Sequence, residues 1–278
     1  MIEKIGEFTG REQKVLTYKS WCPESEEIKA CIVAIHGLGG DTSVFKSLAE
    51  YLTSHNYVIY AFDLRGHGLN RGEYPGHIES MDHLEKDLLF FIDLIKKEVP
   101  EKKVFLLGHC LGGLVCLIYA IHHPQLDGII ATSPLLALQI KIPGIKKLLK
   151  KLTKDPEKKI PFEIDQKLLT SDLKILKKYL SDKNRLKEIS IKTYSEIDKA
   201  MKWALSNAEN LYCPVLILQA GNEKLSDKKV VKQFFERIKT ENKNYKEYPL
   251  LLHEIISEKT KTQVFQDIFL WLEKHLKK

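Results

Sequence analysis

The sequence is poor in features that mark membrane-spanning, secreted or metal-binding proteins. Its first ten residues, MIEKIGEFTG, contain no apolar stretch suited to a signal peptide, and no lipidation motif occurs. Only five of the 278 residues are cysteine, an odd number without repeated spacing, so no disulfide framework is indicated. His122 and His123 are adjacent on an expected helix and cannot face one metal ion, and we expect neither a metal nor another cofactor. The lack of a signal peptide, a lipidation motif and a disulfide framework predicts a cytoplasmic protein.

Acidic residues are under-represented in one part of the chain. The formal net charge is +7, and residues 134–212 alone contain 17 Lys and one Arg against ten Asp and Glu. The remaining sequence is close to neutral. These lysines form no nucleic-acid-binding motif and show no pattern of interleaved aromatic residues, so we expect no nucleic-acid partner. A basic surplus confined to one segment instead indicates an electrostatic role for that segment.

Short apolar runs typical of buried strands alternate with longer runs that have helical spacing. Strands are predicted over residues 15–21, 30–35, 57–62, 103–107, 128–132, 214–219 and 244–248. Helices are predicted over residues 42–54, 83–98, 114–121, 230–238 and 263–276, the first of them capped by Thr42 or Ser43. This alternation predicts an α/β fold with a mostly parallel sheet flanked by helices.

The alternation stops between residues 134 and 212. This stretch keeps helical periodicity over residues 145–152, 171–180 and 195–205, so it is an insertion and not a linker. Binding sites in such folds lie at the carboxyl edge of the sheet. We therefore predict a core of residues 1–133 and 213–278, and a helical cap of residues 134–212 over that edge.

A nucleophile turn is predicted at residues 108–113, which read Gly-His-Cys-Leu-Gly-Gly. An apolar strand-like run precedes it and an apolar helix-like run follows it, which is the context that makes a Gly-x-nucleophile-x-Gly motif credible. The turn is so sharp that side chains at Gly108 and Gly112 would clash with neighbouring backbone. Cys110 would then stand at a helix N-terminus, where the helix field favours a thiolate. His109 and the glycines interrupt the apolar stretch and argue against a membrane span.

Six motifs resemble the α/β-hydrolases, and specifically the monoacylglycerol lipase and lysophospholipase-like family, in order and spacing. They are HGLGG at 36–40, DLRGHG at 63–68, HIESMDHLEKDL at 77–88, GHCLGG at 108–113, PVLILQAGNEKLSD at 214–227 and YPLLLHEI at 248–255. The cap resembles the family only in place and length. The resemblance implies the α/β-hydrolase fold and a carboxylic ester hydrolase of lipid metabolism, acting on monoacylglycerol, lysophospholipid or another small acyl ester.

The three catalytic roles of this fold follow in the chain order nucleophile, acid, histidine. Cys110 stands at the nucleophile position. His253 is the expected base, because it follows the last predicted strand, whereas we expect His275 to be solvated on the terminal helix. The family has Asp in the loop after the PVLIL strand, and this chain has Glu223 at the aligned position. Asp227 is the rival acid, or else a helix cap.

The oxyanion hole of such an enzyme needs two backbone N–H groups aimed at one point. Leu111 follows the nucleophile and is expected to supply one of them. The HGLGG turn is expected to supply the other through Leu38. For His36, His67 and His109 we prefer a structural role, in which their rings shape turns by hydrogen bonding.

Cysteine at the nucleophile position leaves three interpretations open. A thiolate is already a good nucleophile near neutral pH, and an adjacent histidine can hold it as an ion pair, so Cys110 can be a natural nucleophile. The chain can instead be a catalytically weak or inactive relative that binds acyl ligands, or the cysteine can have been introduced to trap a complex. Thiol chemistry also suits a thioesterase or acyltransferase.

A basic amphipathic helix is predicted within residues 139–152. Ile145, Leu148 and Leu149 share one face, while Lys146 and Lys150 lie on the opposite face. Such a helix can lie on an anionic lipid surface and deliver lipid-like substrates, which would make the protein peripheral at a membrane. The alternative is a cap helix whose apolar face packs on the core.

Overall fold

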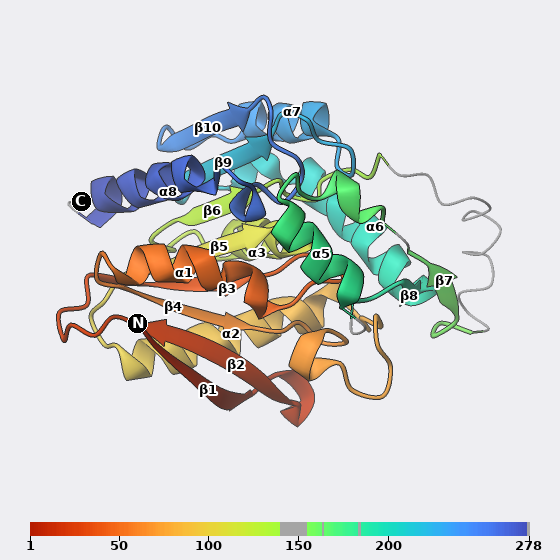
Figure 1. Cartoon of the computed structure of the whole chain (residues 1–278), viewed down its shortest axis with the longest axis horizontal. Helices are drawn as coiled ribbons and strands as arrows, with labels where there is room; N and C mark the ends of the chain where they lie inside the picture. Colours follow the sequence, from red (N-terminus) through yellow and green to blue (C-terminus); the bar gives the residue numbers. More distant parts are fainter. Residues whose placement is uncertain (140–154, 163, 183–184, 277–278) are drawn as a thin grey trace.

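An eight-stranded, mostly parallel sheet forms the centre of the computed structural model, which describes residues 1–139, 155–162, 164–182 and 185–276 (Figure 1). The strand order is β1-β2-β4-β3-β5-β6-β9-β10. The pairs β1–β2 and β2–β4 are antiparallel, and all later neighbours are parallel. The strands are β1 (Ile2–Thr9), β2 (Val15–Cys22), β3 (Ala30–Ile35), β4 (Tyr57–Phe62), β5 (Val104–His109), β6 (Ile129–Thr132), β9 (Val215–Ala220) and β10 (Lys243–Tyr248).

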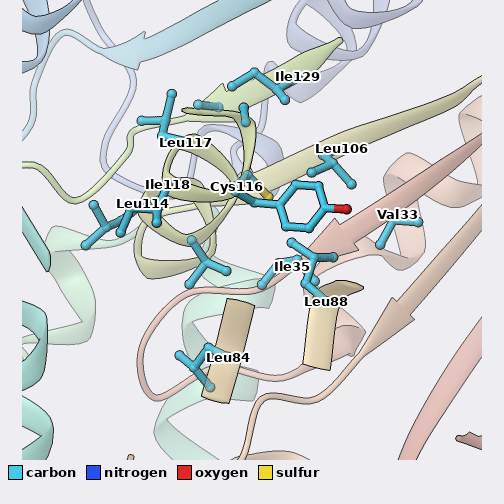
Figure 2. Close-up of a cluster of buried hydrophobic side chains, with 14 of the residues drawn as sticks. Val33, Ile35, Leu84, Leu88, Leu106, Leu114, Cys116, Leu117, Ile118 and Ile129 are labelled. Carbon is cyan, nitrogen blue, oxygen red and sulfur yellow. The ribbon is translucent and has the colours of Figure 1, made fainter. Parts of the chain in front are cut away.

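Helices cover both faces of this sheet, which explains why its central strands are continuous apolar runs. In β3, Val33 and Ile35 join the hydrophobic cluster on one face, and Ile32 and Ala34 join the cluster on the other. The first cluster includes α2 (Met81–Glu98), α3 (Leu111–His122), α6 (Ile191–Ser206) and α7 (Lys228–Arg237), and the second includes α1 (Lys46–Thr53) and α8 (Lys261–Leu276). Figure 2 shows part of the first cluster, where side chains of α2 and α3 meet those of β3 and β5. The predicted fold class is confirmed.

Two local expectations need correction, and one strand was not predicted. The side chain of Asp41, not Thr42 or Ser43, caps the turn before α1 by accepting the Ser43 N–H at 2.7 Å. Strand β1 was not predicted, because Phe8 is its only buried residue and its apolar residues do not alternate. His275 is buried and not solvated, with Nδ1 2.7 Å from the Trp271 carbonyl oxygen, because α8 packs that face against the sheet.

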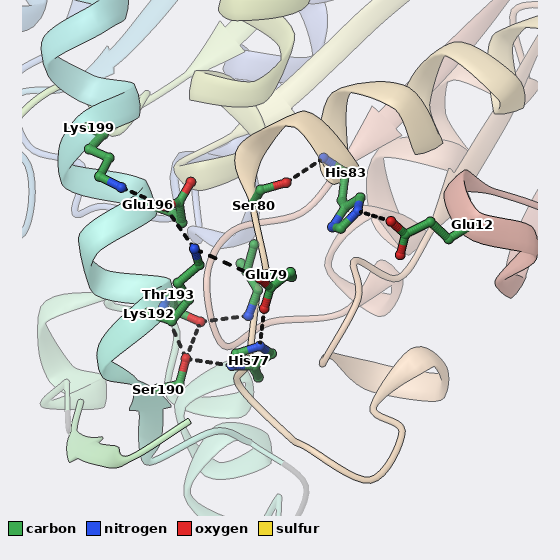
Figure 3. Close-up of polar contacts among 11 residues, drawn as sticks. Glu12, His77, Glu79, Ser80, His83, Ser190, Lys192, Thr193, Glu196 and Lys199 are labelled. Atoms are coloured by element: carbon green, nitrogen blue, oxygen red, sulfur yellow. Dashed lines mark hydrogen bonds and ion pairs between the residues drawn. The ribbon is translucent and has the colours of Figure 1, made fainter. Parts of the chain in front are cut away.

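The segment between β6 and β9 is an insertion that contacts the core at several places. Its described part contains β7 (Lys159–Pro161), α5 (Leu173–Ser181), β8 (Glu188–Ser190) and α6, while the helix predicted over residues 145–152 lies outside the described residues. At the start of α6, the Ile78 N–H donates to Thr193 Oγ1 at 2.7 Å, and the Ser190 hydroxyl lies 2.9 Å from His77 Nδ1 (Figure 3). The insertion is thus joined to the loop that precedes α2.

Candidate active site

The β5–α3 turn holds Cys110 in a strained backbone conformation. Its φ of 53° and ψ of −114° lie in a region that side-chain-bearing residues rarely occupy. A Cβ on Gly108 would lie 2.3 Å from the Gly112 carbonyl oxygen, and a Cβ on Gly112 would lie 2.0 Å from the Ile35 carbonyl oxygen. Only glycine therefore allows α3 to start this close to β3 and β5, as the sequence predicts.

Cys110 lies at the wall of a cleft on the carboxyl edge of the sheet. The empty space in the cleft, open solvent included, is about 770 Å³. Its wall is apolar in large part, through Val44, Leu135, Leu138, Phe162, Leu169 and Leu225. Since residues of the insertion and of the loops after β3, β5, β9 and β10 all contribute, the cleft lies between the sheet edge and the insertion.

His253 lies in the loop after β10 and reaches the same cleft. Its side chain is nearly fully buried, and Nδ1 lies 2.7 Å from Glu223 Oε2. Burial disfavours the imidazolium, but the charges of Cys110 and Glu223 and the hydrogen bonds to both side chains outweigh it and raise the pKa of His253 well above its usual value. The structure therefore brings Cys110, His253 and Glu223 together from three separate loops.

Glu223 is oriented by backbone donors as well as by His253. Its Oε1 accepts the N–H of Leu225 at 2.8 Å and that of Ser226 at 3.3 Å. Burial alone would raise the pKa of Glu223, but His253 and these N–H groups lower it below its usual value. Asp227 does not share this position, because its carboxylate accepts the Lys229 N–H at 2.9 Å and caps α7.

The HGLGG turn after β3 lies against the cysteine turn. A Cβ on Gly37 would lie 2.9 Å from the Cβ of Cys110, so glycine is needed for this approach. Leu38 lines the cleft, and Leu111 is the first residue of α3, whose N–H has no intrahelical acceptor. That these two N–H groups converge on one oxyanion stays a prediction.

The other histidines of the site region have structural partners, as expected. His36 Nε2 accepts the Leu64 N–H at 2.9 Å, and His67 Nδ1 lies 2.8 Å from the Arg65 carbonyl oxygen. His109 Nδ1 lies 3.1 Å from the Thr132 carbonyl oxygen. Burial, with the nearby positive charge of His253, lowers the pKa of His109 well below its usual value.

The sequence reasoning missed several polar residues of the cleft wall. Three of them contact one another, namely Tyr179 and Arg185 in the insertion and Glu254, which directly follows His253. Tyr179 and Arg185 carry no motif, since the insertion resembles the family only in place and length. Glu254 could have been singled out by its position beside the predicted base.

Two other kinds of feature, a metal site and a membrane-spanning helix, are absent from the described part of the chain. No three His, Cys, Asp or Glu side chains gather there as metal ligands. Of the described helices, none combines the length and apolar character needed to cross a membrane. The basic stripe of residues 145–152 lies outside the described residues.

Comparison with known proteins gives consistent matches along the chain. A family model described as serine aminopeptidase, S33 matches residues 26–260. The chain is 32% identical over 251 residues to phospholipase YtpA of Bacillus subtilis (strain 168), covering 88% of this chain and 96% of that protein.

Solved structures match as well. A monoacylglycerol lipase from Paleococcus ferrophilus is similar with a TM-score of 0.82 at 31% identity, covering 94% of this chain and 99% of that one. A soluble variant of monoglyceride lipase from Saccharomyces cerevisiae, in complex with a substrate analog, has a TM-score of 0.89 at 23% identity. That match covers 99% of this chain and 96% of that one, and it concerns the fold.

Proposed function

Since the chain belongs to the serine aminopeptidase S33 family of α/β-hydrolases, we propose that it is a carboxylic ester hydrolase in which Cys110 is the nucleophile, His253 the base and Glu223 the acid that orients the base. One observation carries this proposal: His253 is hydrogen-bonded to Glu223 through Nδ1 at 2.7 Å, and it shares the cleft wall with Cys110, whose charge raises the pKa of His253. Catalytic triads require this order of contacts, because the base must be held on one side and reach the nucleophile with the other.

The proposed reaction proceeds through a thioester. His253 holds the proton of Cys110, and the thiolate attacks the ester carbonyl carbon, whose π electrons move to the oxygen. The N–H groups of Leu38 and Leu111 would stabilise that oxyanion. Its collapse breaks the ester C–O bond, and His253 protonates the departing alcohol. His253 then deprotonates a water molecule that attacks the thioester carbon. Collapse of this second tetrahedral intermediate breaks the C–S bond and releases the carboxylic acid, and the proton held by His253 returns to the Cys110 sulfur.

The proposed substrates are monoacylglycerols, lysophospholipids or other small acyl esters. The names of the relatives, a phospholipase and monoacylglycerol lipases, support this class. The apolar part of the cleft wall provides a surface for an acyl chain, and the residues around Lys178, Arg185 and Glu254 provide a polar surface for the alcohol part.

A direct test is intact-mass measurement after exposure to an activated acyl ester. We expect one acyl adduct, which peptide mapping assigns to Cys110. Turnover of p-nitrophenyl esters should disappear in Cys110→Ala, and Cys110→Ser would report whether a hydroxyl can replace the thiol. Cys22→Ser, at the other incompletely buried cysteine, is the matched control and should behave as wild type. Unchanged turnover in Cys110→Ala would refute the proposal.

A second candidate function is favoured by the thiol itself. A thioester intermediate can pass its acyl group to another thiol or alcohol as well as to water, so the enzyme would be a thioesterase or acyltransferase. Product analysis with an added alcohol or thiol distinguishes the cases, since a transferase forms the new ester or thioester in preference to the free acid. An adduct that forms and never turns over would indicate an acyl binder.

The insertion has a proposed role in substrate delivery. Residues 134–212 would act as a cap over the core of residues 1–133 and 213–278, and the basic stripe of residues 139–152 would bring the cleft to an anionic lipid surface. The local charge surplus of the insertion supports this proposal.

A further inference from the structure

Two buried carboxylates flank His253 in the loop of residues 249–258, which we term the histidine loop. Glu258 is 1% exposed and accepts the N–H of Leu252, the residue before His253, at 3.0 Å. The same carboxylate accepts the N–H of Ser171 at 3.1 Å and also the Ser171 hydroxyl. Glu258 thereby joins the residue in front of His253 to the start of α5 in the insertion.

Glu254, directly after His253, is held by the insertion in the same way. It is 6% exposed, and its carboxylate accepts the Tyr179 hydroxyl and an Arg185 N–H, the latter at 3.2 Å. The Arg185 guanidinium also stacks on Tyr179, 4.0 Å from the ring centroid. Burial and the charge of Glu254 raise the pKa of Tyr179, so its hydroxyl stays protonated and donates.

Backbone contacts extend this attachment along the histidine loop. The Glu254 N–H donates to the Leu169 carbonyl oxygen at 2.8 Å. The hydroxyl of Thr170 donates to the Ser257 carbonyl oxygen at 2.9 Å. The side chain of His253, by contrast, hydrogen-bonds to Glu223 of the core, and the charge of Cys110, also of the core, raises its pKa. The imidazole is thus placed by the core, and the backbone on either side of it by the insertion.

We propose that Glu258, Glu254 and Tyr179 are positioning residues, through which the insertion holds the histidine loop so that His253 stays within hydrogen-bonding reach of Cys110. This inference rests on the proposed function and adds a second task to the insertion beyond covering the substrate. The physical reason is that the histidine loop has little regular structure of its own, and a displacement of about 1 Å at a catalytic group can cost on the order of a hundredfold in rate.

The test uses Tyr179→Phe and Glu258→Gln in the full-length protein. Tyr248→Phe is the matched control, because Tyr248 is also buried, lies five residues before His253 and donates to a carboxylate, that of Asp267 at 2.6 Å, which belongs to α8 and not to the insertion. Three quantities are measured: kcat and KM with a p-nitrophenyl ester, the pH dependence of Cys110 alkylation by iodoacetamide, and the melting temperature.

We expect both variants to lower kcat roughly ten- to a hundredfold with KM unchanged. The pH at which alkylation of Cys110 is half-maximal should rise, because a displaced imidazolium no longer stabilises the thiolate. Tyr248→Phe should change neither quantity. If both variants lower only the melting temperature, and leave kcat and the alkylation profile as in wild type, the positioning role is refuted.

Alkylation requires no ester turnover, which separates this inference from the proposed function. Wild-type protein that is alkylated normally but forms no acyl adduct would refute the proposed hydrolase while leaving the positioning result readable. If Glu258→Gln does not fold, Tyr179→Phe decides alone, since it removes a single oxygen atom and keeps the ring under Arg185.

Discussion

At the scale of single residues, two neighbouring imidazoles show how partners set the state of a buried histidine. The ring centroids of His109 and His253 are 4.9 Å apart, and both rings are almost completely buried. The hydrogen bonds of His109 are to neutral groups of Thr132. Among the described residues no anion therefore offsets burial, which lowers the pKa of His109. His253 lies between Glu223 and Cys110, and their charges raise its pKa despite burial.

The Glu223–His253 pair predicts a pH-dependent stability. The folded pKa of Glu223 lies below its ordinary value of 4.5, so its contribution is present above pH 4.5 and is lost as the pH falls through the folded value. The folded pKa of His253 lies above its ordinary value of 6.5, so its contribution is present below pH 6.5 and is lost as the pH rises through the folded value. The pair should therefore stabilise the folded protein most between pH 4.5 and pH 6.5.

Glu223→Gln tests this directly. We expect a loss of about 3 kcal/mol in the free energy of unfolding at pH 5.5, from breaking a buried ion pair, and a smaller loss at pH 9.5. Ester turnover should fall at least about a hundredfold, because the imidazole loses its orienting anion. Urea denaturation at both pH values provides the measurement. Asp227→Asn, which alters only the α7 cap, is the control and should retain turnover.

At the scale of elements, the strand–turn–helix unit of β5 and α3 depends on two glycine backbones. Gly112 faces the Ile35 carbonyl oxygen of β3, and a Cβ there would lie 2.0 Å from it. Relief of this clash would require α3 to move away from β3, and α3 is buried along nearly its whole length. The turn and the hydrophobic core are therefore coupled.

Gly112→Ala should destabilise the protein by about 3 kcal/mol or more, as overpacking against rigid backbone does. Gly40→Ala is the matched control in the neighbouring HGLGG turn, because its Cβ would meet the nearest atom, the Gly37 carbonyl oxygen, at 3.4 Å. That substitution should change the free energy of unfolding by less than about 1 kcal/mol. Equal effects of the two substitutions in chemical denaturation would contradict the steric argument.

At the scale of the whole molecule, positive charge is concentrated in the insertion while the cleft lies beneath it. Residues 134–212 carry eight more basic than acidic residues, by 17 Lys and one Arg against ten Asp and Glu. Positive charge on the insertion attracts an anionic surface, and this attraction weakens as the salt concentration rises.

The change of Lys146, Lys147, Lys150 and Lys151 to Glu should abolish binding to anionic liposomes in flotation assays, and moderate salt should weaken binding of the wild type. Turnover of a water-soluble ester should stay within about twofold of wild type, since these residues are proposed to deliver substrate and not to act on it. The control replaces the exposed lysines Lys4, Lys14, Lys97 and Lys102 of the core with Glu. Liposome binding that survives in the insertion variant would refute the delivery role, whatever the core variant does.

Most of the sheet and the residues of the candidate site that the structure brings together could be predicted from local patterns. The strands β3 and β4 have the predicted bounds, because their apolar runs are buried on both faces and end at turns. Glu223 and Asp227 were both candidates for the acid, and spacing alone favoured Glu223. The contact that distinguishes them, between Glu223 and His253, forms only when the loops fold together, whereas Asp227 caps α7. Strand β1 has no periodicity of its own and is defined by its pairing with β2.

The sequence by itself determined the order of elements, the cysteine turn and the identity of the groups that can do chemistry, because apolar periodicity and glycine-dependent turns are local properties of the chain. Only the tertiary structure decided which groups meet: that His275 is buried, that Glu223 hydrogen-bonds to His253, and that Tyr179 and Ser171 of the insertion hydrogen-bond to Glu254 and Glu258 of the histidine loop. These contacts join residues about 30 to 90 positions apart or depend on helix packing, and no local pattern encodes them.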